Sequence, residues 1–180
     1  IRLRGLIAKI FNLQSNLKDF KFIIDVTNVK LDLNNDYIMI LHGTSKENKK
    51  WSLENWELLI NWFIEHTNKN IVTTYSNSDE LNFVTKLNKK ITNSRFVVID
   101  KLNFSELSGL IKESCLVVGV DTGFTHMANL LKIPTIAIYL HSKPSYVGIV
   151  ESNIAFNLGG YKQELKPTEV INCILKNKLI

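Results

Sequence analysis

Residues 116–139, LVVGVDTGFTHMANLLKIPTIAIY, decide the fold of this chain. They open with the apolar run 116–120, whose valines suit a strand that is buried on both faces. Apolar residues then recur at helical spacing over 124–131, and Ile133-Pro134 ends that helix before a second β-branched strand at 135–139. The stretch therefore predicts a βαβ unit.

A short polar turn, Asp121-Thr122-Gly123, joins the first strand of this unit to its helix. Unpaired backbone N–H groups and the helix dipole at such a turn favour an anion, most often a phosphate. Asp121 or Thr122 is expected to cap the helix. The same residues also fit a capped turn that binds no ligand, and this stretch alone does not separate the two interpretations.

The rest of the chain repeats the alternation of strand and helix. Strands are expected at 37–42, 70–75 and 95–100, with a further possible strand at 153–157. Helices are expected after Ser52, over 81–87 and 104–111, and from Pro167 to about residue 176. This order predicts an α/β fold, a doubly wound parallel sheet of Rossmann-like type.

Residues 36–180 form the predicted compact domain, and residues 1–35 are interpreted as the end of an N-terminal domain and a linker. Within that linker region, 1–13 resembles a basic amphipathic helix packed on a neighbour, and 14–35 is polar with one apolar island at 20–26. The chain begins with Ile1, so we expect that a preceding N-terminal part is missing.

Composition and charge limit the possible classes of protein. The 180 residues are 45% hydrophobic, enough for one domain with a full core. The 22 Lys and Arg exceed the 17 Asp and Glu, but this excess is spread out and permits phosphate-bearing ligands or an anionic membrane surface without requiring either. No nucleic-acid partner is expected. Cys115 and Cys173 lack metal-type spacing and are expected to be reduced thiols in a cytosolic protein. No apolar run approaches the ~20 residues of a membrane span, and no signal peptide is visible.

Three polar loops are expected to meet at the carboxyl edge of the predicted sheet, where ligands of this fold bind. They are 43–50, 76–80 and 121–123. Together they offer hydroxyls and lysines for phosphates, and a carboxylate for a ribose or sugar hydroxyl. The glycines form neither G-x-G-x-x-G nor a P-loop, which argues against a standard dinucleotide enzyme or P-loop NTPase.

Two of these regions carry a resemblance to a known family. LHGTSKENKKWSLENWELLI, residues 41–60, resembles the start of the second domain of bacterial lipopolysaccharide heptosyltransferases, with the pattern L-H-[AG]-[TS]-[TS] through K-x-W. Residues 117–139 resemble the V-D-T-G-x-x-H signature of that family, glycosyltransferase family 9, and 3–13 resemble its segment before the second domain. The match favours the type I enzyme and covers only its second half.

The resemblance implies a two-domain GT-B glycosyltransferase whose second, Rossmann-like domain binds the donor ADP-heptose. Such an enzyme transfers heptose with inversion to the lipopolysaccharide inner core, on a Kdo-lipid A acceptor at the cytoplasmic face of the inner membrane, where the protein is peripheral. The general base is expected to be an aspartate of the first domain, so no catalytic residue is assigned in this chain. The resemblance implies no cofactor, and no carboxylate cluster predicts a metal site.

The resemblance also implies donor-binding positions, namely Thr44, Ser45, Lys49, Glu80, Leu102, Asp121, Thr122, Gly123 and His126. Thr44 and Ser45 would contact the diphosphate, together with Thr122 and Gly123 at the helix N-terminus. Lys49 would neutralise phosphate charge as the nucleoside diphosphate leaves. Without the resemblance, the hydroxyl residues are equally ordinary loop residues and Lys49 a solvated charge.

The remaining positions belong to the nucleoside and the sugar. Glu80 would bind the ribose hydroxyls, Leu102 would lie against adenine, and Asp121 would bind heptose hydroxyls with support from His126. Residue chemistry alone also fits an acid in the first turn of a helix, a core leucine and a structural histidine.

The loop 140–144 departs from the family pattern G-P-T-D-P, because here it reads LHSKP and lacks both the glycine and the aspartate. Two other classes therefore stay open: a non-catalytic remnant that binds nucleotide, and another two-domain sugar-nucleotide enzyme such as an epimerase.

Overall fold

The computed structural model describes residues 26–27, 29–31, 33 and 36–180. The helix expected over 1–13 and most of the linker expected over 14–35 lie outside the described residues. The first strand begins at Tyr37, and Val29, Leu31 and Leu33 ahead of it pack against the core.

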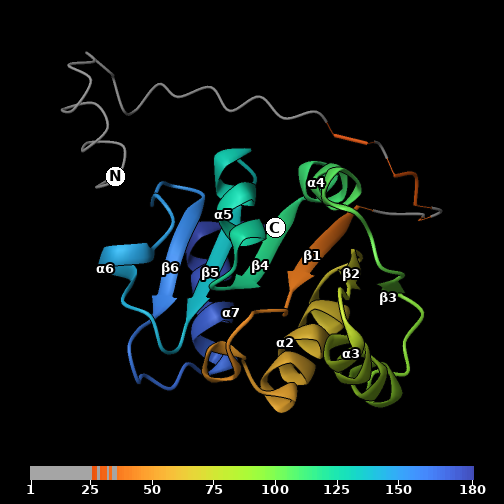
Figure 1. The fold of residues 1–180 in the computed structure, drawn as a ribbon, viewed down its shortest axis with the longest axis horizontal. Helices are drawn as coiled ribbons and strands as arrows, with labels where there is room; N and C mark the ends of the chain where they lie inside the picture. The colour runs from red at the N-terminus through yellow and green to blue at the C-terminus, as the bar shows by residue number, and fades with distance from the viewer. Residues whose placement is uncertain (1–25, 28, 32, 34–35) are drawn as a thin grey trace.

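The described part of the chain folds around one six-stranded parallel sheet, in the order β3-β2-β1-β4-β5-β6 (Figure 1). Its strands are β1 (Tyr37–Leu41), β2 (Asn70–Thr74), β3 (Phe96–Ile99), β4 (Leu116–Val120), β5 (Thr135–Tyr139) and β6 (Ala155–Gly159). Every pair of neighbouring strands is parallel, as in the pairing of Met39 with Val72 on one side and Val117 on the other. The order reverses between β1 and β4, which makes this the topological switch point of a doubly wound sheet. The predicted fold class is confirmed.

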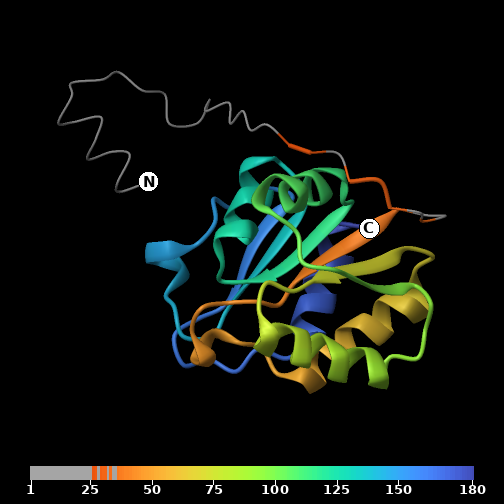
Figure 2. The same cartoon turned by 45° about the vertical axis from the view of Figure 1, so that its right-hand side comes forward.

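Helices cover both faces of the sheet (Figure 2). They are α2 (Leu53–His66), α3 (Ser78–Lys90), α4 (Phe104–Glu113), α5 (Gly123–Leu130), the short α6 (Pro144–Val147) and α7 (Pro167–Asn177), with a 3-10 turn, η1 (Glu47–Lys49). Ile38 and Ile40 of β1 pack in one apolar core with residues of α2, α3 and α7, whereas Met39 packs in a second core with residues of α4 and α5. Successive side chains of a strand point to opposite faces, so the unbroken apolar run of β1 supplies both cores.

Local sequence signals explain where most helices begin. The Ser52 hydroxyl accepts a hydrogen bond from the backbone N–H of Asn55 and starts α2, as expected. Asn103 and Glu106 form a reciprocal capping box at the start of α4. Pro167 occupies the first turn of α7, where its missing N–H costs nothing.

Two local predictions need correction, and one helix was not expected. Helix α3 begins at Ser78 rather than at residue 81, because the Asn77 side chain caps it by accepting from the N–H of Glu80. Strand β6 begins at Ala155 rather than at residue 153, because Ser152 N–H bonds the carbonyl of Ala155 and closes a turn ahead of it. The turn of helix α6 was not expected at all.

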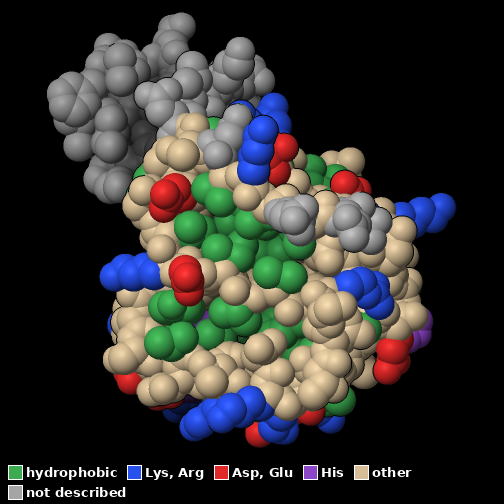
Figure 3. Space-filling model, turned by 90° about the vertical axis from the view of Figure 1, so that its right-hand side faces the viewer, with side chains coloured by type: hydrophobic (Ala, Val, Ile, Leu, Met, Phe, Trp, Pro, Cys, Tyr) green, Lys and Arg blue, Asp and Glu red, His purple; other side chains and the backbone are tan. Residues whose placement is uncertain are grey.

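Strand β3 forms one edge of the sheet, and three of its four side chains are only half-buried. Figure 3 faces this side of the molecule and shows hydrophobic side chains gathered at the surface there. No helix among the described residues is long and apolar enough to cross a bilayer.

The loop between β1 and α2 is anchored at its far end by Trp51. This side chain is only 2% exposed, and its indole N–H donates to the carbonyl of Leu165 at 2.8 Å. Its ring also meets that of Trp56 edge to face, with 4.9 Å between ring centres. The polar residues 43–50 are therefore held between the sheet and this buried anchor.

Candidate functional site

The sheet order sets the order of the loops at its carboxyl edge. The segment after β2 leads to Glu80 in the first turn of α3, the loop after β1 carries Thr44 to Lys49, and the loop after β4 carries Asp121. These loops are neighbours because the strands before them are neighbours. The sequence-based expectation that the three loops meet at one edge is confirmed.

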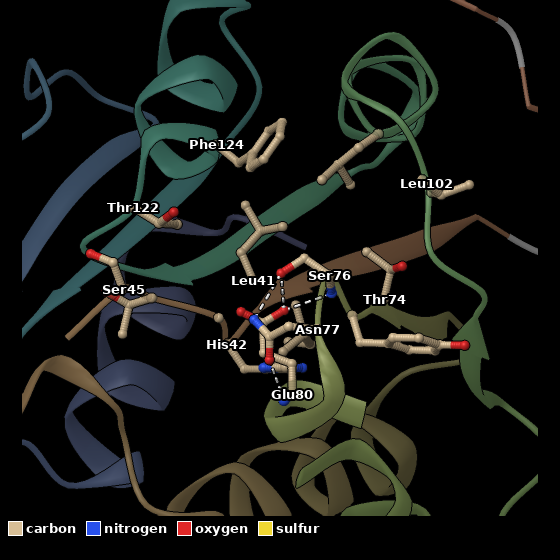
Figure 4. A pocket seen from close by; sticks show the side chains of 15 residues that line it. Leu41, His42, Ser45, Thr74, Ser76, Asn77, Glu80, Leu102, Thr122 and Phe124 are labelled. Atoms are coloured by element: carbon tan, nitrogen blue, oxygen red, sulfur yellow. Dashed lines mark hydrogen bonds between the residues drawn. The ribbon is translucent and has the colours of Figure 1, made fainter. Parts of the chain in front are cut away.

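A cavity of about 360 Å³ opens between these loops at the switch point. Its lining contains five of the predicted donor-binding residues, namely Thr44, Ser45, Glu80, Leu102 and Thr122. Leu41, Leu107 and Phe124 give it apolar walls, and Figure 4 shows Leu102 and Phe124 on elements that lie apart from each other around it. The cavity thus combines apolar walls with a few polar groups, which is the usual composition of a small-molecule site.

Glu80 is positioned by its own helix turn. Its Oε2 accepts hydrogen bonds from the backbone N–H and the hydroxyl of Ser76, each at 2.7 Å (Figure 4). The carboxylate also lies over Gly43, where an added Cβ would come within 2.7 Å of Glu80 Cδ. Gly43 is therefore required for the close approach of Glu80 to the loop after β1. No lysine or arginine within the described ranges lies in ion-pair distance of this carboxylate.

His42 is a residue of this cavity that the sequence analysis did not single out. Its side chain is 5% exposed, its ring lies 5.0 Å from that of Phe83, and Nε2 has no hydrogen-bond partner among the described residues. Burial lowers the pKa of His42 to about 4, so the imidazole is neutral at physiological pH. The sequence feature that could have identified His42 is its position directly after the apolar run 37–41, at the carboxyl end of a predicted strand.

Asp121 lies at the centre of a second polar group beside the cavity. Its Oδ2 accepts from the Lys49 ammonium at 2.5 Å and from the Ser142 hydroxyl at 2.5 Å. His126 Nε2 lies 3.8 Å from the other carboxylate oxygen, and the Thr44 hydroxyl donates to the backbone carbonyl of Asp121 at 3.4 Å. Residues from the loops after β1 and β5 and from helix α5 thus converge on one aspartate.

These contacts decide the charge of Asp121. Burial alone raises the pKa of its carboxyl, because the side chain is only 9% exposed. The neighbouring His126, Lys49 and Ser142 outweigh burial and hold the pKa well below its usual range. Asp121 is therefore a carboxylate at every physiological pH. The role of Ser142 could not be read from the sequence, since it lies in the loop that departs from the family pattern.

The start of α5 differs from the expectation that Asp121 or Thr122 caps it. Thr122 takes the N-cap position, but its side chain makes no capping hydrogen bond, and the Asp121 carboxylate is bound to Lys49 and Ser142 instead. The first N–H groups of a helix have no partner within it. Gly123 is exposed beside Thr122, and a Cβ added there would meet nothing within 4 Å. This helix start is open to an anion.

Within the described ranges, no group of three or more His, Cys, Asp or Glu residues is arranged to hold a metal ion. Lys49 and Lys50 both place positive charge near the cavity, Lys49 beside Asp121 and Lys50 beside His42. Cys115 and Cys173, which were expected to be reduced thiols, are both free.

Comparisons with known proteins agree with this geometry. Lipopolysaccharide heptosyltransferase 1 of Campylobacter coli is 28% identical over 169 residues, which are 86% of this chain and 49% of that relative. The chain spans about a third to a half of the length of the curated relatives that it matches.

Solved structures show the same fold. E. coli heptosyltransferase WaaC with ADP has a TM-score of 0.71 and 23% identity, over 79% of this chain and 44% of that one. WaaC with ADP-2-deoxy-2-fluoro heptose has a TM-score of 0.72 and 20% identity, over 98% of this chain and 55% of that one. The family model of glycosyltransferase family 9 (heptosyltransferase) matches residues 6–179. This chain belongs to glycosyltransferase family 9.

Proposed function

We propose that this chain is the donor-binding half of a two-domain GT-B heptosyltransferase and that its cavity binds ADP-heptose. The observation that carries the proposal is the cavity at the switch point, with the Glu80 carboxylate at one end and the Lys49–Asp121 pair beside the other. Its volume of about 360 Å³ falls within the range of small-ligand pockets. Two solved structures of WaaC, which share this fold, contain ADP and ADP-2-deoxy-2-fluoro heptose.

The nucleoside end is assigned to the side of β2 and β3. Glu80 accepts hydrogen bonds from the ribose hydroxyls through the oxygen that Ser76 does not occupy. Leu102 packs against adenine, because it lines the cavity on the loop after β3 and presents an apolar surface. This assignment supports a purine nucleoside without requiring a charged contact to the base.

The diphosphate is assigned to the switch point. Thr44 and Ser45 donate from the loop after β1, and the N–H groups around Thr122 and Gly123 donate from the uncapped start of α5. Lys49 supplies the positive charge that the leaving nucleoside diphosphate needs. Because Lys49 already pairs with Asp121, phosphate and Asp121 would share one ammonium.

The heptose lies next to Asp121, on the far side of the diphosphate from Glu80. An anion repels phosphate, so hydroxyl groups of the sugar are its suitable partners, and His126 supports the carboxylate from 3.8 Å away. The acceptor, Kdo-lipid A, attacks the anomeric carbon with inversion after a base of the first domain takes its proton. The reaction takes place at the cytoplasmic face of the inner membrane.

Calorimetric titration of the chain with ADP, UDP and NAD tests this proposal. We expect ADP to bind more tightly than the other two, and Glu80→Gln to weaken ADP but not an analogue without ribose hydroxyls. Glu54→Gln, on the exposed side of α2, is the matched control. A preference for UDP would instead support a sugar-nucleotide enzyme of another kind, such as an epimerase.

A second experiment tests where the chemistry lies. The purified 180-residue chain, mixed with ADP-heptose and a lipid A precursor that carries its sugar acids, is expected to transfer no heptose. Robust turnover would show that the base and the acceptor site were assigned to the wrong half.

A further inference from the structure

The loops after β5 and β6 lie along the same edge of the sheet as the proposed donor site, beyond the loop that carries Asp121. Strand order places them next to the loop after β4, on the side away from Glu80. Neighbouring parallel strands are about 5 Å apart, so these loops begin within roughly 10 Å of the sugar end. If the donor lies as proposed above, on which this inference rests, whatever attacks the anomeric carbon approaches over these loops.

Five side chains of these two loops form what we call the Tyr161 cluster: His141, Lys143, Tyr146, Tyr161 and Lys162. The Lys143 ammonium lies 6.0 Å from the ring centre of Tyr161 and the Lys162 ammonium lies 5.5 Å from it. His141 meets the same ring edge to face at 5.8 Å, and Lys143 also lies 6.0 Å from the ring centre of Tyr146. One tyrosine therefore gathers two ammonium groups from two different loops.

The positive charge of the cluster is not neutralised. Over residues 36–180, neither Lys143 nor Lys162 forms an ion pair, whereas Lys49, Lys50, Lys69 and Lys90 each pair with a carboxylate. Glu164 is the nearby acid: it lines the same open groove of about 520 Å³ as His141 and Lys162 without pairing with either. Two like charges near one ring favour an anion between them.

The cluster is also exposed and aromatic. Tyr146 is 61% exposed and Tyr161 is 51% exposed, although both are large side chains. Exposed tyrosine rings offer flat apolar surface with a polar tip, on which the C–H face of a sugar ring packs. Together with the two lysines, they match the chemistry of a sugar that carries a carboxylate.

The cluster is directly connected to the donor site. Ser142, which donates to Asp121 at 2.5 Å, stands between His141 and Lys143 in the chain. The connection after β5 that holds the Asp121 carboxylate therefore also carries three members of the cluster, His141, Lys143 and Tyr146. We propose that the Tyr161 cluster is an acceptor subsite of this half, in which the tyrosines pack on an acidic sugar of the acceptor and Lys143 and Lys162 bind its carboxylate.

The test is a titration of the chain, saturated with ADP, with the methyl glycoside of a 3-deoxy-octulosonic acid, followed by NMR. We expect the dissociation constant to rise about threefold for Lys143→Gln or Lys162→Gln and about tenfold for the double variant, the scale of exposed ion pairs. The matched control is Lys86→Gln with Lys112→Gln, two exposed lysines on α3 and α4, which should leave binding unchanged. Shifted resonances should map to 141–146 and 161–162.

Three comparisons make the result decisive. The carboxyl-reduced form of the same sugar should bind at least several-fold more weakly, and equal binding of the two forms would overturn the role of the lysines. Equal binding to the wild-type chain and the double variant would overturn the subsite itself. The double variant should bind ADP normally. A wild-type chain that binds ADP but not the acidic sugar would overturn this inference alone, whereas a wild-type chain that does not bind ADP would overturn the donor site.

A membrane surface is the other source of anions for such a patch. Vesicles of phosphatidylglycerol and phosphatidylcholine in equal parts are therefore included as a separate arm. Lysine-dependent binding to vesicles without any binding of the acidic sugar would replace the proposed subsite with a membrane contact. Binding of the acidic sugar, together with vesicle binding that does not depend on Lys143 and Lys162, supports the proposal.

Discussion

The two ends of the site satisfy their carboxylates in opposite ways. Glu80 is held by neutral donors of Ser76, four residues away in the chain, whereas Asp121 is held by Lys49 and Ser142, which are 72 and 21 residues away. The Glu80 end thus rests on local hydrogen bonds with no ion pair among the described residues, and the Asp121 end rests on tertiary contacts that include an ion pair. We infer that the first is ready for a neutral ligand group, while the second must exchange its own contacts for those of a ligand.

The largest expected effect concerns the buried histidine at the Glu80 end. The pKa of His42 is lowered from 6.5 to about 4 by burial, so the stability it contributes is complete above about pH 6.5 and lost as the pH falls to about 4. We expect the wild-type chain to lose about 3 kcal/mol of unfolding free energy in this window and His42→Gln to lose little. Urea denaturation at several pH values measures this, with His66→Gln, on the exposed surface, as the control. If His42→Gln loses as much unfolding free energy in this pH window as the wild-type chain, the prediction is wrong.

The Asp121 end should respond in a different pH window. Because the pKa of Asp121 is held below its usual value of about 4, its stabilisation is complete above that pH and lost only in stronger acid. At neutral pH we expect Asp121→Asn to cost about 2 kcal/mol, the scale of a charged hydrogen bond.

Asp36→Asn is the matched control, because Asp36 pairs with Lys69 at 3.4 Å while its side chain stays 77% exposed. Its loss should stay below about 1 kcal/mol. Equal losses for both variants, or a loss for Asp121→Asn that persists in strong acid, would remove the contrast between the two ends.

Ligand binding should separate Lys49 from Asp121. We expect Lys49→Ala to weaken ADP binding by about 1–3 kcal/mol, because it removes the ammonium nearest the proposed diphosphate. Asp121→Asn should leave ADP affinity unchanged or slightly improved, since it releases Lys49 from its ion pair, yet it should weaken ADP-heptose.

Calorimetry with both ligands measures this. The control is Lys90→Ala, since Lys90 pairs with Glu57 of α2 instead of Asp121. If Asp121→Asn weakens the binding of ADP and ADP-heptose equally, the aspartate does not bind the heptose.

The smallest effects come from two glycines, one at each end. Gly43→Ala should cost about 1 kcal/mol of stability and weaken ADP, because the new methyl group displaces the Glu80 carboxylate. Gly123→Ala should change stability by less than about 0.5 kcal/mol, because an added Cβ there meets nothing within 4 Å. It should still weaken ADP, since the methyl group would project where the diphosphate is assigned. Thermal unfolding and ADP titration test both, and equal stability losses would contradict the assignment of Gly43.

The sequence predicted what depends on local patterns. The buried strand at 116–120, the helix after Ser52 and the position of Asp121 at a strand end follow from periodicity and capping, which act over a few residues. Glu80 was expected in the loop before the helix but lies in the first turn of α3, because the Asn77 cap that starts this helix was overlooked.

What the sequence could not predict depends on contacts between distant segments. The pairing of Lys49 with Asp121, the hydroxyl of Ser142 on the same carboxylate and the burial of His42 all require the strand order, which brings these loops together. The lysines of the Tyr161 cluster are ordinary charges in the sequence, and only the meeting of two loops on one ring distinguishes them.

Because Trp51 anchors the loop after β1, its intrinsic fluorescence should report on the position of that loop. Of the chain's three tryptophans, Trp51 alone terminates a loop of the proposed donor site, and its indole N–H is bound to a carbonyl on the connection that leads to α7. The emission of Trp51 depends on its hydrogen bond to Leu165 and on the neighbouring Trp56 ring. A ligand that pulls residues 43–50 toward its phosphates should therefore shift the wavelength of the emission maximum, and no added label is needed. The fluorescence of Trp51 can thus be used to follow closure of this loop on the millisecond scale.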